Sequence, residues 1–148
     1  PTFFGFERDG LPDSVIADIK QSIKHPARLS YFGLNPIRKP TLDKKINQLK
    51  NAGVVLLVGT DSGIPMKFHS QSTWNELDVW VNRFGFDPMY TIRAATYWPA
   101  VAMGVEKDFG TVSEGKYADI IAVKGDVLKH IALLQDVKMV VKKGKRYK

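Results

Sequence analysis

The stretch VVLLVGTDSG, residues 54–63, decides the fold. Its first five residues are all apolar and show no period of two, so the run predicts a strand buried on both faces, as in parallel sheets. A helical pattern and a short turn precede it, which is the second half of a βαβ unit. Because the carboxyl ends of such strands open onto the ligand crevice, we expect Asp61, three residues after Val58, at that rim.

The carboxylate of Asp61 has two interpretations on spacing alone. In the first, it caps the following backbone in an Asx-turn and has only a structural role. In the second, it is a functional group that the strand end presents to a ligand. Ser62 and Gly63 shape the turn in either case, since glycine permits backbone conformations closed to other residues. The residues by themselves leave both interpretations open.

Composition narrows the possible chemistry. The chain has 148 residues, of which 44% are hydrophobic and 25% charged, an ordinary globular composition. It contains no cysteine, which excludes disulfides and thiolate metal sites. Its three histidines, at positions 25, 69 and 130, form no HxH or HExxH pair. No apolar run approaches the roughly 20 residues that span a bilayer. The chain therefore lacks a conventional histidine-rich metal site of its own.

Helical spacing recurs through the first two thirds of the sequence. Residues 25–40 hold three prolines and predict a loop between the first two helices. Trp74, Trp80 and Trp98 lie at helical spacing among other apolar residues, which favours a place in the core. The predicted helices are 12–25, capped by Asp13 or Ser14; 41–53, with Thr41 as N-cap and Gly53 as stop; 72–85, with Thr73 and Glu76 as a capping box; a helix capped by Asp87 with Pro88 in its first turn; and a short one from Pro99.

The pattern changes at Gly110. GTVSEGKYADIIAVKGD has strand-like segments separated by turn residues, and VKMVVKKGKRY alternates around KKGK as a hairpin does. The sequence therefore predicts an α/β portion over residues 1–109 and a small β portion over residues 110–148.

Positive charge is concentrated at the end of the chain. Residues 116–148 carry nine Lys/Arg against three Asp/Glu, and this segment holds nearly all of the formal net charge of +7. A basic patch of this kind suits nucleic acid or anionic lipid. Lysines on hairpin edges, which block unwanted strand pairing, are the commoner cause, and we favour that interpretation.

Five segments in order resemble the C-terminal third of the amidohydrolase superfamily, in its imidazolonepropionase-like and prolidase-type dipeptidase branch. The resemblance covers roughly residues 52–148 and is specific, because the segments agree in both sequence and spacing. PTFFGF, at the start, resembles the end of a seventh barrel strand. The five segments are AGVVLLVGTDSG, STWNEL, TIRAAT, GTVSEGKYADIIAV and VKMVVKKGKRY.

The resemblance implies the last strands and helices of a metal-dependent (β/α)₈ TIM-type barrel, followed by part of a small β-sandwich. It implies that Asp61 ends the eighth strand, binds the catalytic metal and shuttles a proton during hydrolysis of a C–N bond. The substrate is expected to be a small molecule such as a dipeptide or N-acyl amino acid. His69, Ser62 and Gly63 are the expected substrate-binding residues, and one or two divalent ions, zinc foremost, are the expected cofactors.

The same resemblance implies further polypeptide. The family's other ligands are an HxH pair, a lysine or acid, and two histidines on earlier strands, so we expect them upstream of Pro1. We also expect the chain to fold stably only with that preceding portion, to be inactive alone, and to form part of a homo-oligomer. No nucleic-acid or membrane partner is expected.

Two alternatives remain at this stage. A basic module that binds nucleic acid would lose affinity steeply with salt, but the sequence lacks the aromatic and basic interleaving of single-strand binders. A catalytically inactive relative, kept for structure, would differ from the enzyme only in ligands outside this sequence.

Overall fold

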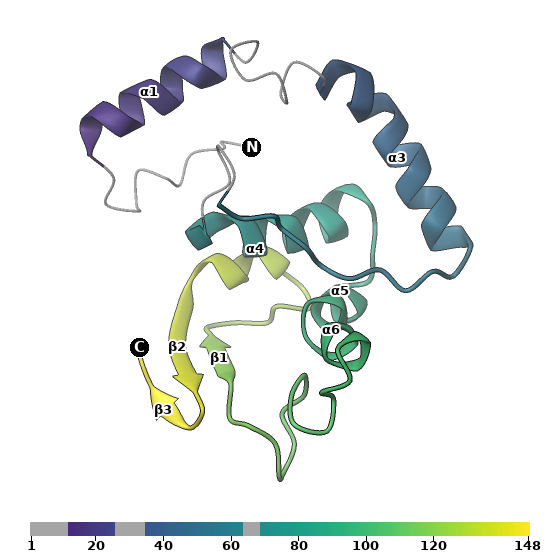
Figure 1. The fold of residues 1–148 in the computed structure, drawn as a ribbon, viewed down its shortest axis with the longest axis vertical. Coiled ribbons are helices and arrows are strands. Elements are labelled where there is room, and N and C mark those ends of the chain that lie inside the picture. The colour runs from purple at the N-terminus through teal and green to yellow at the C-terminus, as the bar shows by residue number, and fades with distance from the viewer. Residues whose placement is uncertain (1–11, 26–34, 64–68) are drawn as a thin grey trace. The chain divides into compact units, whose positions relative to one another are not determined.

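A computed structural model describes residues 12–25, 35–63 and 69–148 (Figure 1). The expectations for residues 1–6 and for the loop at residues 26–34 lie outside this part of the chain. Packing divides the chain into two compact units, Pro1–Val54 with Asp61–Gln71 and Val55–Thr60 with Ser72–Lys148. The predicted boundary between an α/β portion, residues 1–109, and a β portion, residues 110–148, stays a prediction. No helix in the described ranges is long and apolar enough to cross a membrane.

Helix α1, Asp13–Lys24, confirms the first predicted helix, but its predicted side-chain cap is wrong. The N-cap position is Pro12, whose carbonyl accepts hydrogen bonds from the amides of Val15 and Ile16 at 2.9 and 3.1 Å. Asp13 is the first helical residue instead, where a negative charge favours the positive end of the helix dipole.

Helix α3, Asn35–Asn51, begins six residues before Thr41, so the predicted loop is wrong from Asn35 onward and Thr41 is not the N-cap. Pro40 lies inside the helix near its start, where it removes one of the earliest backbone hydrogen bonds. The hydroxyl of Thr41 donates to the carbonyl of Arg38 at 2.9 Å.

The predicted end of this helix is confirmed. Gly53 adopts φ +68° and its amide donates to the Lys50 carbonyl at 3.1 Å. The amide of Val54 reaches back to the Leu49 carbonyl at 3.2 Å. This pair of bonds is the Schellman arrangement, which glycine permits because it has no Cβ to clash at positive φ.

The second unit contains most of helix α4, His69–Asp78, which continues into a π-helical turn, Val79–Arg83. Because α4 begins at His69, the predicted capping box of Thr73 and Glu76 is wrong. Trp80, at the π-turn, is buried as predicted and its ring packs against Phe86, with centroids 5.0 Å apart. Trp74 and Trp98 are half-buried.

Helices α5, Pro88–Ala95, and α6, Tyr97–Ala102, pack against each other. The predicted start of α5 is confirmed: Asp87 is the N-cap, its carboxylate accepts from the Tyr90 amide at 2.8 Å, and Pro88 opens the first turn. The final helix includes Pro99 but starts two residues before it. Buried Thr91, Ala94 and Ala100 line these helices.

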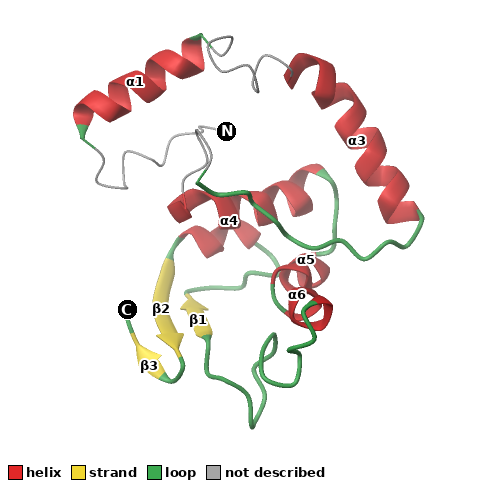
Figure 2. Cartoon of the chain, viewed as in Figure 1, coloured by secondary structure: helices red, strands yellow, loops and turns green. Residues whose placement is uncertain are grey.

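The β portion is a three-stranded antiparallel sheet of order β1-β2-β3 (Figure 2). Its strands are β1, Ile120–Val123; β2, Val137–Lys142; and β3, Lys145–Arg146. The predicted KKGK hairpin is confirmed, because Lys143 and Gly144 both have positive φ, +50° and +76°, as a two-residue type I′ turn requires.

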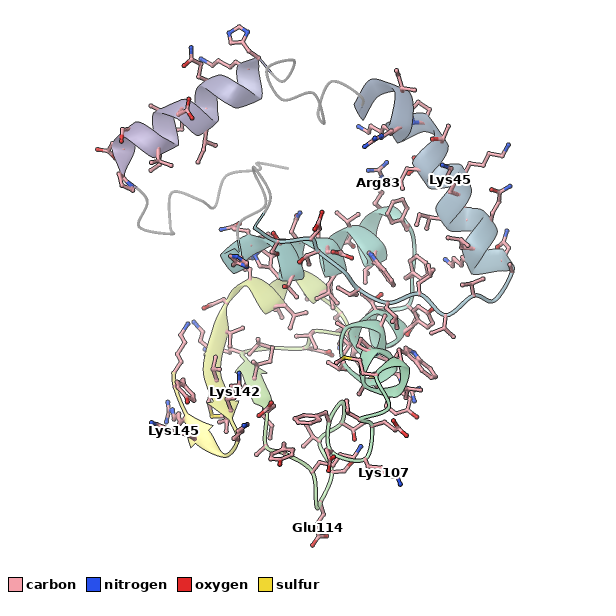
Figure 3. The ribbon with its side chains drawn as sticks, viewed as in Figure 1. Lys45, Arg83, Lys107, Glu114, Lys142 and Lys145 are labelled. Carbon is pink, nitrogen blue, oxygen red and sulfur yellow. The ribbon has the colours of Figure 1, made fainter. Side chains whose placement is uncertain are left out.

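The lysines of this hairpin are exposed. Lys142 and Lys145 are register partners, and both project from the hairpin ribbon in Figure 3. Their place on the short edge hairpin agrees with the interpretation that they block further strand pairing.

The GTVSEGKYADI segment joins the helices to the sheet. The Lys116 ammonium donates to the backbone carbonyls of Glu106 and Phe109. Gly110, with φ +91°, lies against α6. The Asp119 carboxylate accepts from the Lys143 amide at 2.7 Å, which ties β1 to the hairpin turn. These contacts show that the GTVSEGKYADI segment, which is part of the family resemblance, connects the helices to the sheet.

Candidate active site

Residues 54–58, the predicted buried strand, have no regular secondary structure, and that prediction is wrong for the chain as described. Val54, Val55 and Leu57 are 44%, 53% and 42% exposed. A parallel strand needs hydrogen-bonding neighbours at its edges, whereas the three strands in the described ranges pair with one another. Leu56 and Val58 are half-buried, so the apolar run is only partly covered among the described residues.

Helices α4 and α5 hold this segment through its backbone amides. Residues 56, 58 and 59 each donate one hydrogen bond to a group on these helices. The three bonds are Leu56 N–H to Tyr90 Oη at 3.2 Å, Val58 N–H to the Ala94 carbonyl at 3.0 Å, and Gly59 N–H to Glu76 Oε1 at 3.1 Å. The end of the segment therefore has defined anchors within its own unit.

Asp61 follows directly as an exposed residue with φ +52°. Aspartate tolerates this left-handed conformation better than most residues with a side chain. In the described ranges its carboxylate has no hydrogen-bond or ion-pair partner, so the structure gives no support to the Asx-turn interpretation. Within those ranges nothing occupies the carboxylate.

The other expected site residues belong to the same unit as Asp61. Ser62 is half-buried and Gly63 has φ +100°, which favours glycine. His69 is exposed and, instead of lying in a loop, is the first residue of α4. A Cβ on Gly63 would lie 3.6 Å from His69 Nε2, so the glycine backbone and the imidazole are neighbours.

The donors fit a metal ion only as part of a larger set. Carboxylate oxygens such as those of Asp61 are ligands that zinc and harder divalent ions accept. Within residues 12–25, 35–63 and 69–148, no group of three or more His, Asp or Glu is placed to hold an ion. An ion held by Asp61 would therefore need further ligands from beyond these ranges.

Comparison with known families decides the class of the chain. The model of the amidohydrolase family matches residues 14–147, nearly the whole length. The chain belongs to the amidohydrolase family. Members of this family are hydrolases that generally use divalent metal ions. No curated protein sequence matches this amidohydrolase chain.

Solved structures agree with this assignment. An Xaa-Pro dipeptidase with methionine in its active site is 32% identical, with a TM-score of 0.67 over 74% of this chain and 26% of that one. The ochratoxinase of A. niger is 29% identical, with a TM-score of 0.65 over 81% and 27%. A molinate hydrolase is 26% identical, with a TM-score of 0.58 over 68% and 25%. The amidohydrolase chain thus spans about a quarter of each of these three structures.

Sequence reasoning missed the roles of two residues in the site region. The spacing of Glu76 predicts a cap for its own helix, and nothing in the local pattern singles out Tyr90. Each instead binds a backbone amide of residues 54–60. Glu76 lies in STWNEL and Tyr90 directly precedes TIRAAT, two segments of the family resemblance. Their position in or beside these segments was the one sequence signal that they contribute to the site region.

Proposed function

We propose that the intact protein is a metal-dependent hydrolase that cleaves a C–N bond in a dipeptide or N-acyl amino acid. Membership of the amidohydrolase family and similarity to an Xaa-Pro dipeptidase support this proposal. The observation that carries it is the exposed carboxylate of Asp61, which has no partner among the described residues and lies three residues after the apolar run, at the position expected of a metal ligand. Zinc, as one ion or two, is the proposed metal.

The chain's own contribution to the reaction is a carboxylate that holds and moves a proton. The metal ion, when bound, supplies a water molecule acidic enough to act as a nucleophile near neutral pH. Asp61 would accept a proton from the attacking water at a carboxylate oxygen and would deliver it to the leaving nitrogen, which would otherwise depart as a poorly stabilised anion. His69, beside Gly63, contacts the substrate from the same unit.

The remaining part of the site comes from polypeptide outside these residues. The uncovered side chains of Val54, Val55 and Leu57 support this view, because burying them against neighbouring strands would be favourable. In this proposal residues 54–58 become the eighth strand of a (β/α)₈ barrel, and the intact protein assembles as a homo-oligomer.

Asp61→Asn in the intact protein tests the function. Asparagine keeps the size of the side chain but does not hold a proton, so kcat should fall by about 10²–10⁴-fold on a dipeptide panel. Bound metal, measured by elemental analysis, should also fall, while the circular dichroism spectrum stays unchanged. The matched control is Asp78→Asn, because the Asp78 carboxylate contacts Asn82 on its own helix at 2.7 Å. Full activity in Asp61→Asn would refute the proposal.

A further inference from the structure

Glu76 connects helix α4 to the segment that leads to Asp61. Its Oε1 accepts a hydrogen bond from the Gly59 amide at 3.1 Å, and its side chain is half-buried. Of the three amides of residues 54–60 that bind α4 or α5, that of Gly59 is nearest to Asp61 in sequence.

The hydrogen bond from Gly59 to Glu76 restrains a glycine, the residue type with the most backbone freedom. Gly59 has no side chain, and a Cβ built there would meet nothing within 4 Å, so packing does not fix this residue. Glycine samples more backbone conformations than any other residue. Two residues later Asp61 adopts φ +52°, a conformation that few residues populate. An anchor at Gly59 limits the Asp61 backbone to about 7 Å of chain from a fixed point.

We propose that Glu76 is a positioning residue for Asp61, which it serves by holding the Gly59 amide. This inference rests on the proposed function, in which Asp61 must meet a metal ion and a reacting water. A displacement of about 1 Å at such a group costs up to 10²-fold in rate. In this proposal Glu76 contacts neither substrate nor metal. It acts on the reaction only by holding Gly59, which is two residues before Asp61 in the chain.

The acceptor oxygen, not the negative charge, is the essential feature. Glutamine in place of Glu76 would keep an oxygen at the same distance from the helix, whereas methionine has similar length and no good acceptor. Glu76→Gln should therefore retain the position of Asp61, and Glu76→Met should lose it. Asp78→Asn, which removes a carboxylate from the same helix without touching Gly59, is the matched control.

Two measurements on the intact protein test the proposal. Hydrogen exchange of the Gly59 amide, followed by NMR, should be at least about tenfold faster in Glu76→Met and within about threefold of the parent in Glu76→Gln. In the same proteins, kcat should fall about 10- to 100-fold in Glu76→Met with KM nearly unchanged, and Glu76→Gln should restore it.

The outcomes separate this proposal from the proposed function. Unchanged Gly59 exchange in Glu76→Met overturns the anchor. Faster exchange with normal kcat, in a protein that Asp61→Asn inactivates, overturns the positioning role and leaves the function intact. Normal activity in Asp61→Asn overturns the function and with it any catalytic role for Glu76. An equal loss of kcat in Glu76→Gln and Glu76→Met also contradicts the proposal.

Discussion

Replacing Gly110 with alanine should destabilise the protein by about 2–5 kcal/mol. An ideal Cβ at this position would lie 2.8 Å from the Ala100 Cβ and 3.1 Å from both the Thr96 carbonyl oxygen and the Tyr97 Cα. None of these atoms is the end of a flexible side chain, so helix α6 itself would have to move, at a cost of about 1–3 kcal/mol. The φ of +91° adds about 1–2 kcal/mol for any residue with a Cβ.

Gly104→Ala is the matched control for this change. Gly104 also has positive φ, +69°, but a Cβ there would meet nothing within 4 Å. Gly104→Ala should therefore lower the free energy of unfolding only by the backbone contribution of about 1–2 kcal/mol. Denaturant unfolding of the two variants and the parent gives the difference between them, which we expect to be about 1–3 kcal/mol. Equal losses in both variants would refute the close packing of Gly110 against α6.

Three further changes test other parts of the fold. Lys143→Asn should stabilise the protein by about 0.5–1 kcal/mol in thermal unfolding, because asparagine tolerates the positive φ of a type I′ turn better than lysine; no gain would contradict the turn. Lys116→Met should cost about 1–2 kcal/mol through loss of the bonds to two backbone carbonyls, whereas Lys124→Met, at a position without those bonds, should be nearly neutral. Asp87→Ala should cost about 1 kcal/mol by removing the cap of α5, and an unchanged unfolding midpoint would count against that cap.

Local chemistry predicted well those elements whose signals are complete within a few residues. Asp87 followed by Pro88 specifies a helix start, and the KKGK sequence specifies a tight turn, since each places its key groups within one turn of backbone. Gly53 stopped α3 for the same reason. In each case no distant partner is needed to form the predicted hydrogen bonds or dihedral angles.

The predictions that were wrong involve competition between local and distant partners. Thr73 and Glu76 have capping-box spacing, but α4 starts at His69 and the Glu76 carboxylate binds the Gly59 amide, 17 residues earlier in the chain. Thr41 has the chemistry of an N-cap, yet α3 extends past it through Pro40. Spacing alone did not distinguish a cap from an interior residue with another partner.

The structure of residues 54–58 also depends on partners that are distant in the chain. Their apolar pattern predicts burial on both faces, and that burial needs neighbouring strands, which the described residues do not place beside this segment. Asp61 follows this segment as an exposed residue. The role of Asp61 as a metal ligand, and those of Ser62, Gly63 and His69 in substrate binding, stay predictions, because the described residues hold no group of three or more His, Asp or Glu that could bind an ion.

A crystal structure of the intact protein grown with zinc tests the central claim most directly. Anomalous scattering at the zinc edge locates any bound ion without reference to a mechanism. We predict an Asp61 carboxylate oxygen about 2.0–2.2 Å from the ion, with the remaining ligands supplied by other parts of the protein. An Asp61 side chain hydrogen-bonded to protein groups, with the zinc elsewhere or no zinc bound, would contradict the account.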